Sequence, residues 1–133
     1  MVVVDGSGIP LGSQLASASP SEVRLVESTL ARINVRRKKP LRIIADRAYD
    51  SDPLRERLLV QNILLIAPHR RGRTRDAFND GRWLRRYRKR WKVERTFAWL
   101  GNFRRLVTRY EYHLLMYQAF FHLACLLITL RHL

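Results

Sequence analysis

Short apolar and polar blocks alternate along the first half of the chain, and the first two apolar blocks predict a β-hairpin. Residues 2–4 are three valines, and a second short apolar segment follows at residues 9–12. The residues between them, 5–8, are an aspartate, two glycines and a serine, which are residue types that favour a tight turn. Two short extended segments around such a turn are typical of paired antiparallel strands.

A helix is predicted next, over residues 20–33, because apolar residues recur there every three or four positions. Ser19 is the expected N-cap, Pro20 fits the first helical position, and Glu22 stands at the capping-box position. The basic residues among 34–40 are expected to belong to a solvated linker.

Two further apolar segments, residues 41–45 and 63–67, predict buried strands. A helix is expected between them, with Asp52 as its N-cap and Pro53 at its first position. The order strand, helix, strand indicates a parallel pair and hence an α/β sheet.

The second half of the chain predicts helices. After a basic loop at residues 69–81, one long helix is expected over residues 81–106, and a second begins near Glu111. This second helix carries residues 113–130, a stretch of 18 residues without Lys, Arg, Asp or Glu. That length lies at the lower edge for a membrane span. The stretch contains histidine, glutamine and threonine, so a buried core helix is the preferred interpretation and a membrane helix is the alternative.

Composition limits the class of protein. The 133 residues are enough for one domain, and 26 basic residues against 11 acidic ones give a net charge of +15. Of the basic residues, 22 are arginines, whose planar fork suits phosphate groups. The charge therefore predicts salt-sensitive binding to polyanions such as nucleic acid. A single cysteine, Cys125, excludes a scaffold built on internal disulfides.

Two carboxylates stand where they could carry chemistry. Asp46 directly follows a predicted strand, and functional groups of open α/β sheets gather at the carboxyl ends of strands. Glu94 shares a helix face with Tyr87 and Arg90, because the three are spaced three and four residues apart. Mg²⁺ in phosphoryl-transfer sites uses one or two carboxylates, so a metal site is one interpretation. A basic helix with ordinary Glu–Arg pairs is the other, and spacing alone leaves both open.

Three segments of the chain together resemble the insertion-sequence transposases of the bacterial DDE class. They are residues 46–51 (DRAYDS), residues 65–71 (LIAPHRR) and residues 86–106, and they occur in the order found in that family. The resemblance extends over essentially all of the sequence. The family signature spaces Tyr, Arg, Glu and Lys with gaps of two, three and six residues, and Gly101 stands here in place of the final Lys.

The resemblance implies roles for individual residues. Asp46 and Glu94 would be the second and third acids of the catalytic triad and would hold Mg²⁺ or Mn²⁺. Tyr87, Arg90 and Arg95 would contact DNA at the transposon ends and target. The implied reaction is metal-dependent hydrolysis of a phosphodiester, followed by attack of the freed 3′-hydroxyl on target DNA.

The resemblance also implies a fold, a ribonuclease-H-like mixed sheet with long C-terminal helices. The chain would be a single partial catalytic domain over residues 1–133, with strands and crossover helices in 1–68 and the helices that carry Glu94 in 81–133. The first triad acid of the family lies on a central strand that would precede residue 1. Asp5 is explained by turn chemistry instead.

Without that central strand, we expect unpaired strand edges, self-association or completion by an upstream transposase segment, and little activity of the chain alone. The alternative is a catalytically inactive, basic DNA-binding remnant. The expected location is cytoplasmic, with association to the nucleoid.

Other polar residues are given simpler roles. Asp50 and Asp52 are expected to be turn and cap residues, and His69 to lie at the surface or to face phosphate. Packing is the preferred role of the three tryptophans, Trp83, Trp91 and Trp99.

Overall fold

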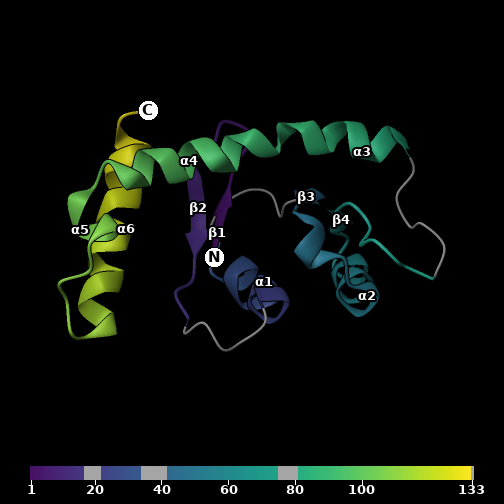
Figure 1. The fold of residues 1–133 in the computed structure, drawn as a ribbon, viewed down its shortest axis with the longest axis horizontal. Coiled ribbons are helices and arrows are strands. Elements are labelled where there is room, and N and C mark those ends of the chain that lie inside the picture. The colour runs from purple at the N-terminus through teal and green to yellow at the C-terminus, as the bar shows by residue number, and fades with distance from the viewer. Residues whose placement is uncertain (17–21, 34–41, 75–80, 133) are drawn as a thin grey trace.

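The computed structural model describes residues 1–16, 22–33, 42–74 and 81–132, which form two small sheets and a set of helices (Figure 1). The strands are β1 (Val2–Val4), β2 (Pro10–Ser13), β3 (Arg42–Ile44) and β4 (Leu64–Ile66). The α-helices are α1 (Glu22–Ala31), α2 (Asp52–Val60), α3 (Gly81–Tyr87), α4 (Trp91–Gly101), α5 (Arg104–Val107) and α6 (Leu114–Leu130). Two 3₁₀ turns complete the set, η1 (Arg47–Tyr49) and η2 (Arg88–Arg90). The predicted cap at Ser19 and the basic residues 34–40 lie outside the described residues.

The predicted β-hairpin is confirmed. β1 and β2 pair antiparallel, with a register shift between Val3 and Val4. Asp5 organises the turn, because its Oδ1 atom accepts hydrogen bonds from the backbone N–H of Ser7 at 2.7 Å and of Ile9 at 2.9 Å. Its side chain therefore serves the turn, as the sequence indicated.

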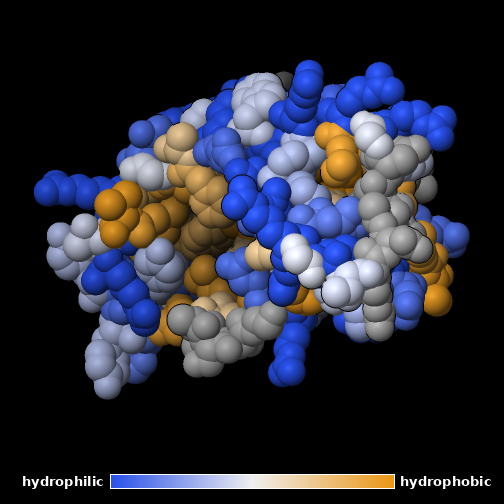
Figure 2. Space-filling view, turned by 45° about the vertical axis from the view of Figure 1, so that its right-hand side comes forward, coloured by the Kyte–Doolittle hydropathy of each residue, from blue (hydrophilic) through white to orange (hydrophobic). Residues whose placement is uncertain are grey.

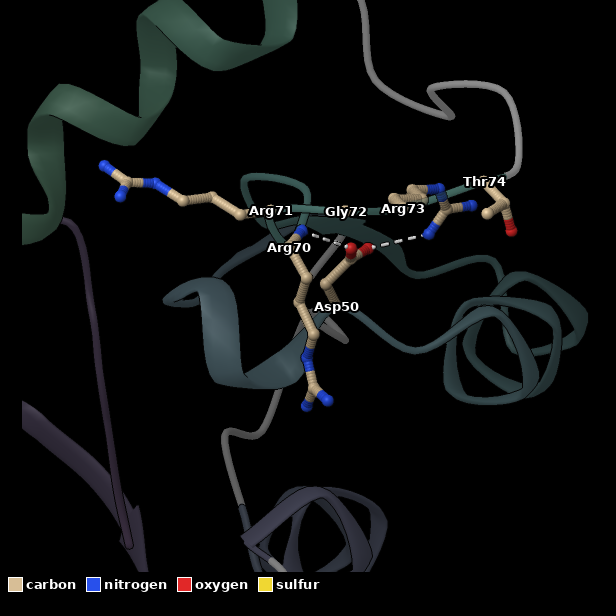
Figure 3. A pocket seen from close by; sticks show the side chains of 6 residues that line it. All are labelled: Asp50, Arg70, Arg71, Gly72, Arg73 and Thr74. Carbon is tan, nitrogen blue, oxygen red and sulfur yellow. Dashed lines mark hydrogen bonds and ion pairs between the residues drawn. The ribbon is translucent and has the colours of Figure 1, made fainter.

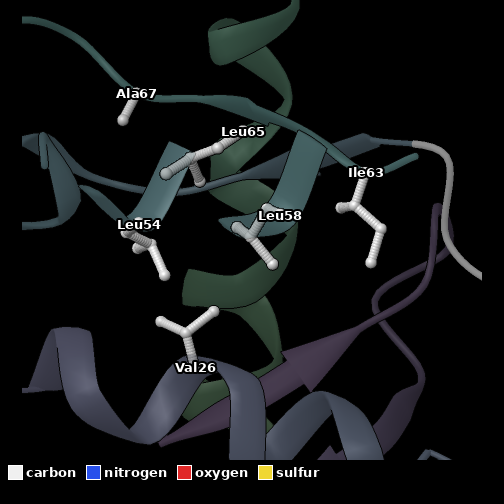
Figure 4. Packing of buried hydrophobic residues seen from close by; sticks show 6 residues of the cluster. All are labelled: Val26, Leu54, Leu58, Ile63, Leu65 and Ala67. Atoms are coloured by element: carbon white, nitrogen blue, oxygen red, sulfur yellow. The ribbon is translucent and has the colours of Figure 1, made fainter. Parts of the chain in front are cut away.

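The predicted parallel pair is also confirmed. β3 and β4 run parallel, and α2 connects them and packs against β4. One core cluster forms where α1, α2 and β4 meet (Figure 4). Its buried members are Val26, Leu54, Leu58, Ile63, Leu65 and Ala67.

The start of α2 differs from the prediction by one residue. Ser51 is the N-cap, with an extended backbone at φ −139° and ψ 117°, and Asp52 is already the first helical residue. Pro53 consequently takes the second helical position, where its missing N–H is equally harmless.

The α/β class holds, but the four strands do not form one mixed sheet. Among the described residues, β1 pairs with β2 alone and β3 pairs with β4 alone, so the two sheets share no strand (Figure 1). In these described segments every strand, β1 and β3 included, keeps one edge without a neighbouring strand.

The prediction of one continuous helix over residues 81–106 was wrong in two places. The 3₁₀ turn η2 separates α3 from α4, and α4 ends at Gly101 before α5 begins. Phe103 is extended there, with φ −90° and ψ 100°. Glycine and asparagine at 101–102 are weak helix formers, and the break lets Phe103 pack on the second core cluster. In the rod formed by α3, η2 and α4, α3 contacts β4 and α4 contacts β1 (Figure 1).

The apolar helix α6 is buried on one face only. Phe121, Ala124 and Ile128 pack with Leu100 of α4 in the second core cluster. The opposite face carries exposed leucines, so the expectation of a buried core helix holds for half of it. In the described ranges, no helix combines the length and apolarity needed to cross a membrane.

Candidate functional site

Asp46 sits at the carboxyl end of β3, as the sequence predicted. It caps the 3₁₀ turn η1, because its Oδ1 atom accepts a hydrogen bond from the backbone N–H of Ala48 at 2.8 Å. The backbone just before it is tied to the neighbouring strand, since the N–H of Ala45 donates to the carbonyl of Ile66 at 3.0 Å. The side chain is 41% exposed, which leaves its second oxygen accessible.

Glu94 lies in the first turn of α4 and is 57% exposed. Its Oε1 atom is 2.5 Å from Nη2 of Arg90, one helical turn earlier. The same guanidinium reaches Asp46, with Nη1 of Arg90 3.9 Å from Oδ2 of Asp46. Two acids far apart in the sequence therefore face one cation.

Tyr87 continues this helix face, and its ring lies 5.7 Å from the Arg90 guanidinium. The predicted alignment of Tyr87, Arg90 and Glu94 on one face is thus confirmed. Gly101, which stands in the place of the lysine of the family signature, is exposed and has open space around it.

Three side chains fix α4 against the hairpin turn that Asp5 organises. Lys92 donates to the carbonyl of Gly6 and Arg95 donates to that of Ser7. Thr96, which is 1% exposed, places its hydroxyl 2.5 Å from the carbonyl of Gly8. These contacts hold the helix that carries Glu94.

The side chain of Arg95 is partly buried, so it also contributes to packing. Its guanidinium lies between the rings of Trp91 and Trp99, 4.8 Å from each ring centre. The predicted packing role is confirmed for Trp99, which packs against the second core cluster, whereas Trp91 is 50% exposed and covers one side of the Arg95 guanidinium. The predicted contact of Arg95 with DNA stays a prediction.

A buried charge cluster around Asp50 was missed by sequence reasoning (Figure 3). Asp50 ends η1, but its side chain is 2% exposed and pairs with Arg55 at 2.7 Å. Its Oδ2 accepts the backbone N–H of Arg70 at 2.8 Å, and Arg73 reaches Oδ1 at 3.2 Å. His69 also lies 3.2 Å from Oδ1, so its side chain, which is 16% exposed, faces this cluster more than solvent. Its other predicted role, to face phosphate, stays a prediction.

Burial alone would raise the pKa of Asp50, but hydrogen bonds from Arg55, from the Arg70 backbone and from His69 outweigh it and lower the pKa to about 2. The simple turn role given to Asp50 was therefore incomplete. The only local signal was Arg55 standing beside Leu54 on a helix that buries Leu54 and Leu58. An arginine inside a core needs a buried partner.

The donor types at Asp46 and Glu94 fit a hard divalent cation. Carboxylate oxygens are the type that Mg²⁺ and Mn²⁺ prefer, and Mg²⁺ commonly uses just one or two protein carboxylates. Asp46 and Glu94 already converge on a common cation, the guanidinium of Arg90. Within the described part of the chain, no group of three or more His, Cys, Asp or Glu side chains is placed to hold a metal.

Fold and site together define a basic α/β protein in which two carboxylates from separate elements, Asp46 and Glu94, both face the guanidinium of Arg90. The chain belongs to the transposase DDE domain family, because the sequence model of that family matches residues 1–129. It is similar to a predicted transposase for insertion sequence element IS402 of Burkholderia cepacia, with 34% identity over 96% of this chain and 60% of that protein. It is also similar to a predicted transposase for insertion sequence element IS6501 of Brucella ovis.

The identity to the Brucella ovis protein is 33%, over 97% of this chain and 95% of that protein. The chain therefore spans less than two thirds of the Burkholderia relative and nearly all of the Brucella one. No solved structure matches the chain.

Proposed function

We propose that this chain is part of the catalytic core of a transposase that cuts and joins DNA at transposon ends with a divalent metal ion. The observation that carries the proposal is the convergence of Asp46 and Glu94 on the guanidinium of Arg90. Membership of the transposase family supports it independently. A net charge of +15 supplies the attraction to DNA.

In this proposal, Asp46 and Glu94 hold Mg²⁺ or Mn²⁺. Such an ion, when bound, activates a water or a 3′-hydroxyl and stabilises the leaving oxygen. Asp46 is held in place by the η1 cap, and Glu94 by the contacts of α4 with the hairpin turn. Tyr87 and Arg90, on the same face, contact the DNA backbone, and Arg95 adds a phosphate contact from its half-buried position.

The first acid of the triad would come from a segment upstream of residue 1. In a ribonuclease-H-like sheet, a further strand lies between the hairpin and the parallel pair. Within the described residues each sheet has two strands, so β1 and β3 both have a free edge that such a strand could pair with. We propose that an upstream transposase segment supplies it, in the same polypeptide or as a partner.

A second copy of the chain is the other proposed partner. The outer face of α6 carries exposed apolar residues, among them Leu115 at 75% and Leu126 at 52%. Figure 2 shows an apolar area on the left of the molecule, with smaller apolar areas on its right. Exposed apolar patches of this kind favour association. The proposed location is the cytoplasm, bound to the nucleoid.

A second candidate function is DNA binding without chemistry. It is favoured by the two acids, rather than three, that the described residues bring to the site. Affinity that falls steeply with salt, together with no metal-dependent cleavage by the chain joined to its upstream segment, would support this alternative.

The test is strand transfer by the chain joined to its upstream segment, on duplexes that carry the transposon ends. Glu94→Gln removes one charge while it keeps the shape of the side chain, and we expect it to abolish cleavage while DNA binding persists. Glu56→Gln, on the exposed side of α2, is the matched control and should remain active. Full activity of Glu94→Gln would contradict the proposed role of the site.

A further inference from the structure

Arg90 is shared by the two carboxylates that are proposed to hold the metal. Its Nη2 atom is 2.5 Å from Glu94, and its Nη1 atom is 3.9 Å from Asp46. Two carboxylates that approach the same group repel each other less when that group carries a positive charge. The guanidinium supplies that charge in the protein without a metal.

The position of Arg90 allows its side chain to move away from Asp46 and Glu94. It is the last residue of η2, the 3₁₀ turn between α3 and α4, and its side chain is 36% exposed. Short 3₁₀ stretches inside longer helices often mark hinges. The ring of Tyr87 lies 5.7 Å from the guanidinium and offers an alternative surface beside the acids.

A guanidinium and a divalent cation cannot occupy the same place between two carboxylates, because both need the same oxygens and repel each other. We propose that Arg90 is an internal counter-ion, which competes with the divalent cation for Asp46 and Glu94 and is released toward DNA phosphates when the cation binds. The inference rests on the proposed metal site. It adds that one arginine sets the metal affinity and links metal binding to DNA binding.

The first experiment measures Mn²⁺ binding to residues 1–133 by electron paramagnetic resonance, without DNA. Arg90→Gln should bind Mn²⁺ roughly two- to fivefold more tightly than the unmodified chain, the range expected from losing exposed ion pairs. Arg88→Gln is the matched control, because it removes the same charge from an exposed arginine of the same 3₁₀ turn. Its effect should be clearly smaller.

Glu94→Gln separates this inference from the proposed function. If Glu94→Gln binds Mn²⁺ as well as the unmodified chain does, the proposed metal site is wrong and the inference fails with it. If Glu94→Gln loses binding while Arg90→Gln and Arg88→Gln behave alike, the metal site stands and the counter-ion role is wrong. Weaker binding by Arg90→Gln also overturns the inference, because it would mean that the arginine helps to assemble the site.

The second experiment tests the link to DNA. Fluorescence anisotropy gives the affinity for a short duplex with and without Mg²⁺ at constant ionic strength. In the unmodified chain, the gain in DNA affinity on adding Mg²⁺ should exceed the gain in Arg90→Gln by roughly two- to fivefold, since the released guanidinium adds a phosphate contact. Arg90→Lys keeps a positive charge and should retain part of this difference. Equal gains in all three proteins would overturn the proposed link.

Discussion

Nη2 of Arg55 lies 2.7 Å from Oδ1 of Asp50, and each of these two side chains is only 2% exposed. Arg55 also donates to the carbonyl of Leu65 at 2.9 Å and to that of Ala67 at 3.2 Å. Asp50 accepts the backbone N–H of Arg70 at 2.8 Å. The pair therefore ties the start of α2 to β4 and to the chain that follows it, close behind the loop that presents Asp46.

Removal of one partner of this pair should destabilise the fold strongly. Asp50→Asn leaves the Arg55 guanidinium buried without its counter-charge, and we expect the free energy of unfolding to fall by about 3–5 kcal/mol. Asp52→Asn is the control. Asp52 pairs with Arg73 and its side chain is 22% exposed, so this change should cost no more than about 1 kcal/mol. Urea denaturation measures both, and equal losses would contradict the special role of Asp50.

Stability should also fall in acid because of Asp50. The pKa of its carboxyl is about 2 in the folded chain, against an ordinary value of 3.8. A carboxyl whose folded pKa is depressed stabilises the fold above its unfolded pKa and loses this effect as pH falls through the folded value. The loss should amount to about 2 kcal/mol between about pH 5 and pH 2. Urea titrations across that range should show it, and Asp50→Asn should lack this component.

The hairpin turn that contacts α4 contains two glycines, Gly6 and Gly8, and we expect substitutions at these two positions to differ in their effect on stability. Gly8 has φ +84°, and a Cβ atom there would lie 3.1 Å from Nη2 of Arg95 and from the carbonyl oxygen of Lys92. Gly8→Ala should therefore lower the free energy of unfolding by about 1–3 kcal/mol. Gly6→Ala, in the same turn but with nothing within 4 Å, should be nearly neutral. Thermal melts compare the two, and similar melting temperatures would count against this packing.

Much of the fold was predictable because its signals are local. The valines at 2–4, the turn after them and the apolar block at 63–67 are each short sequence patterns, and the hairpin and the parallel pair follow from them. The break after Gly101 was not predicted, since the helical pattern continues through 103–106. It depends on Phe103 packing against the second core cluster, which is a contact between distant segments.

The site was predictable only in part, for the same reason. Helical spacing places Tyr87, Arg90 and Glu94 on one face whatever the rest of the fold does. The approach of Arg90 to Asp46 depends on how the α3–η2–α4 rod crosses the sheets. The burial of Asp50 likewise depends on how α2 and β4 fold together around it, and no spacing in the sequence predicts that.

The exposed face of α6 should control self-association. Leu115 is 75% exposed, so Leu115→Glu should leave the free energy of unfolding of the monomer almost unchanged while it weakens association. Val60→Glu, at an 85% exposed position on α2, introduces the same charge away from this face. Sedimentation equilibrium should show a lower association constant for Leu115→Glu alone. Identical behaviour of the two variants would exclude the α6 face as the contact.

Arg95 should matter for stability more than an exposed arginine does. Its guanidinium lies 4.8 Å from the ring centres of both Trp91 and Trp99, and it donates to the carbonyl of Ser7. Arg95→Ala should cost about 1–3 kcal/mol, whereas the exposed Arg88→Ala should cost less than about 0.5 kcal/mol. If Arg95 also binds a phosphate, its loss should reduce the slope of log affinity for DNA against log salt concentration by about 0.9. An unchanged slope in the folded variant would assign Arg95 to holding α4 alone, with Tyr87 and Arg90 left as the proposed DNA contacts of this part of the chain.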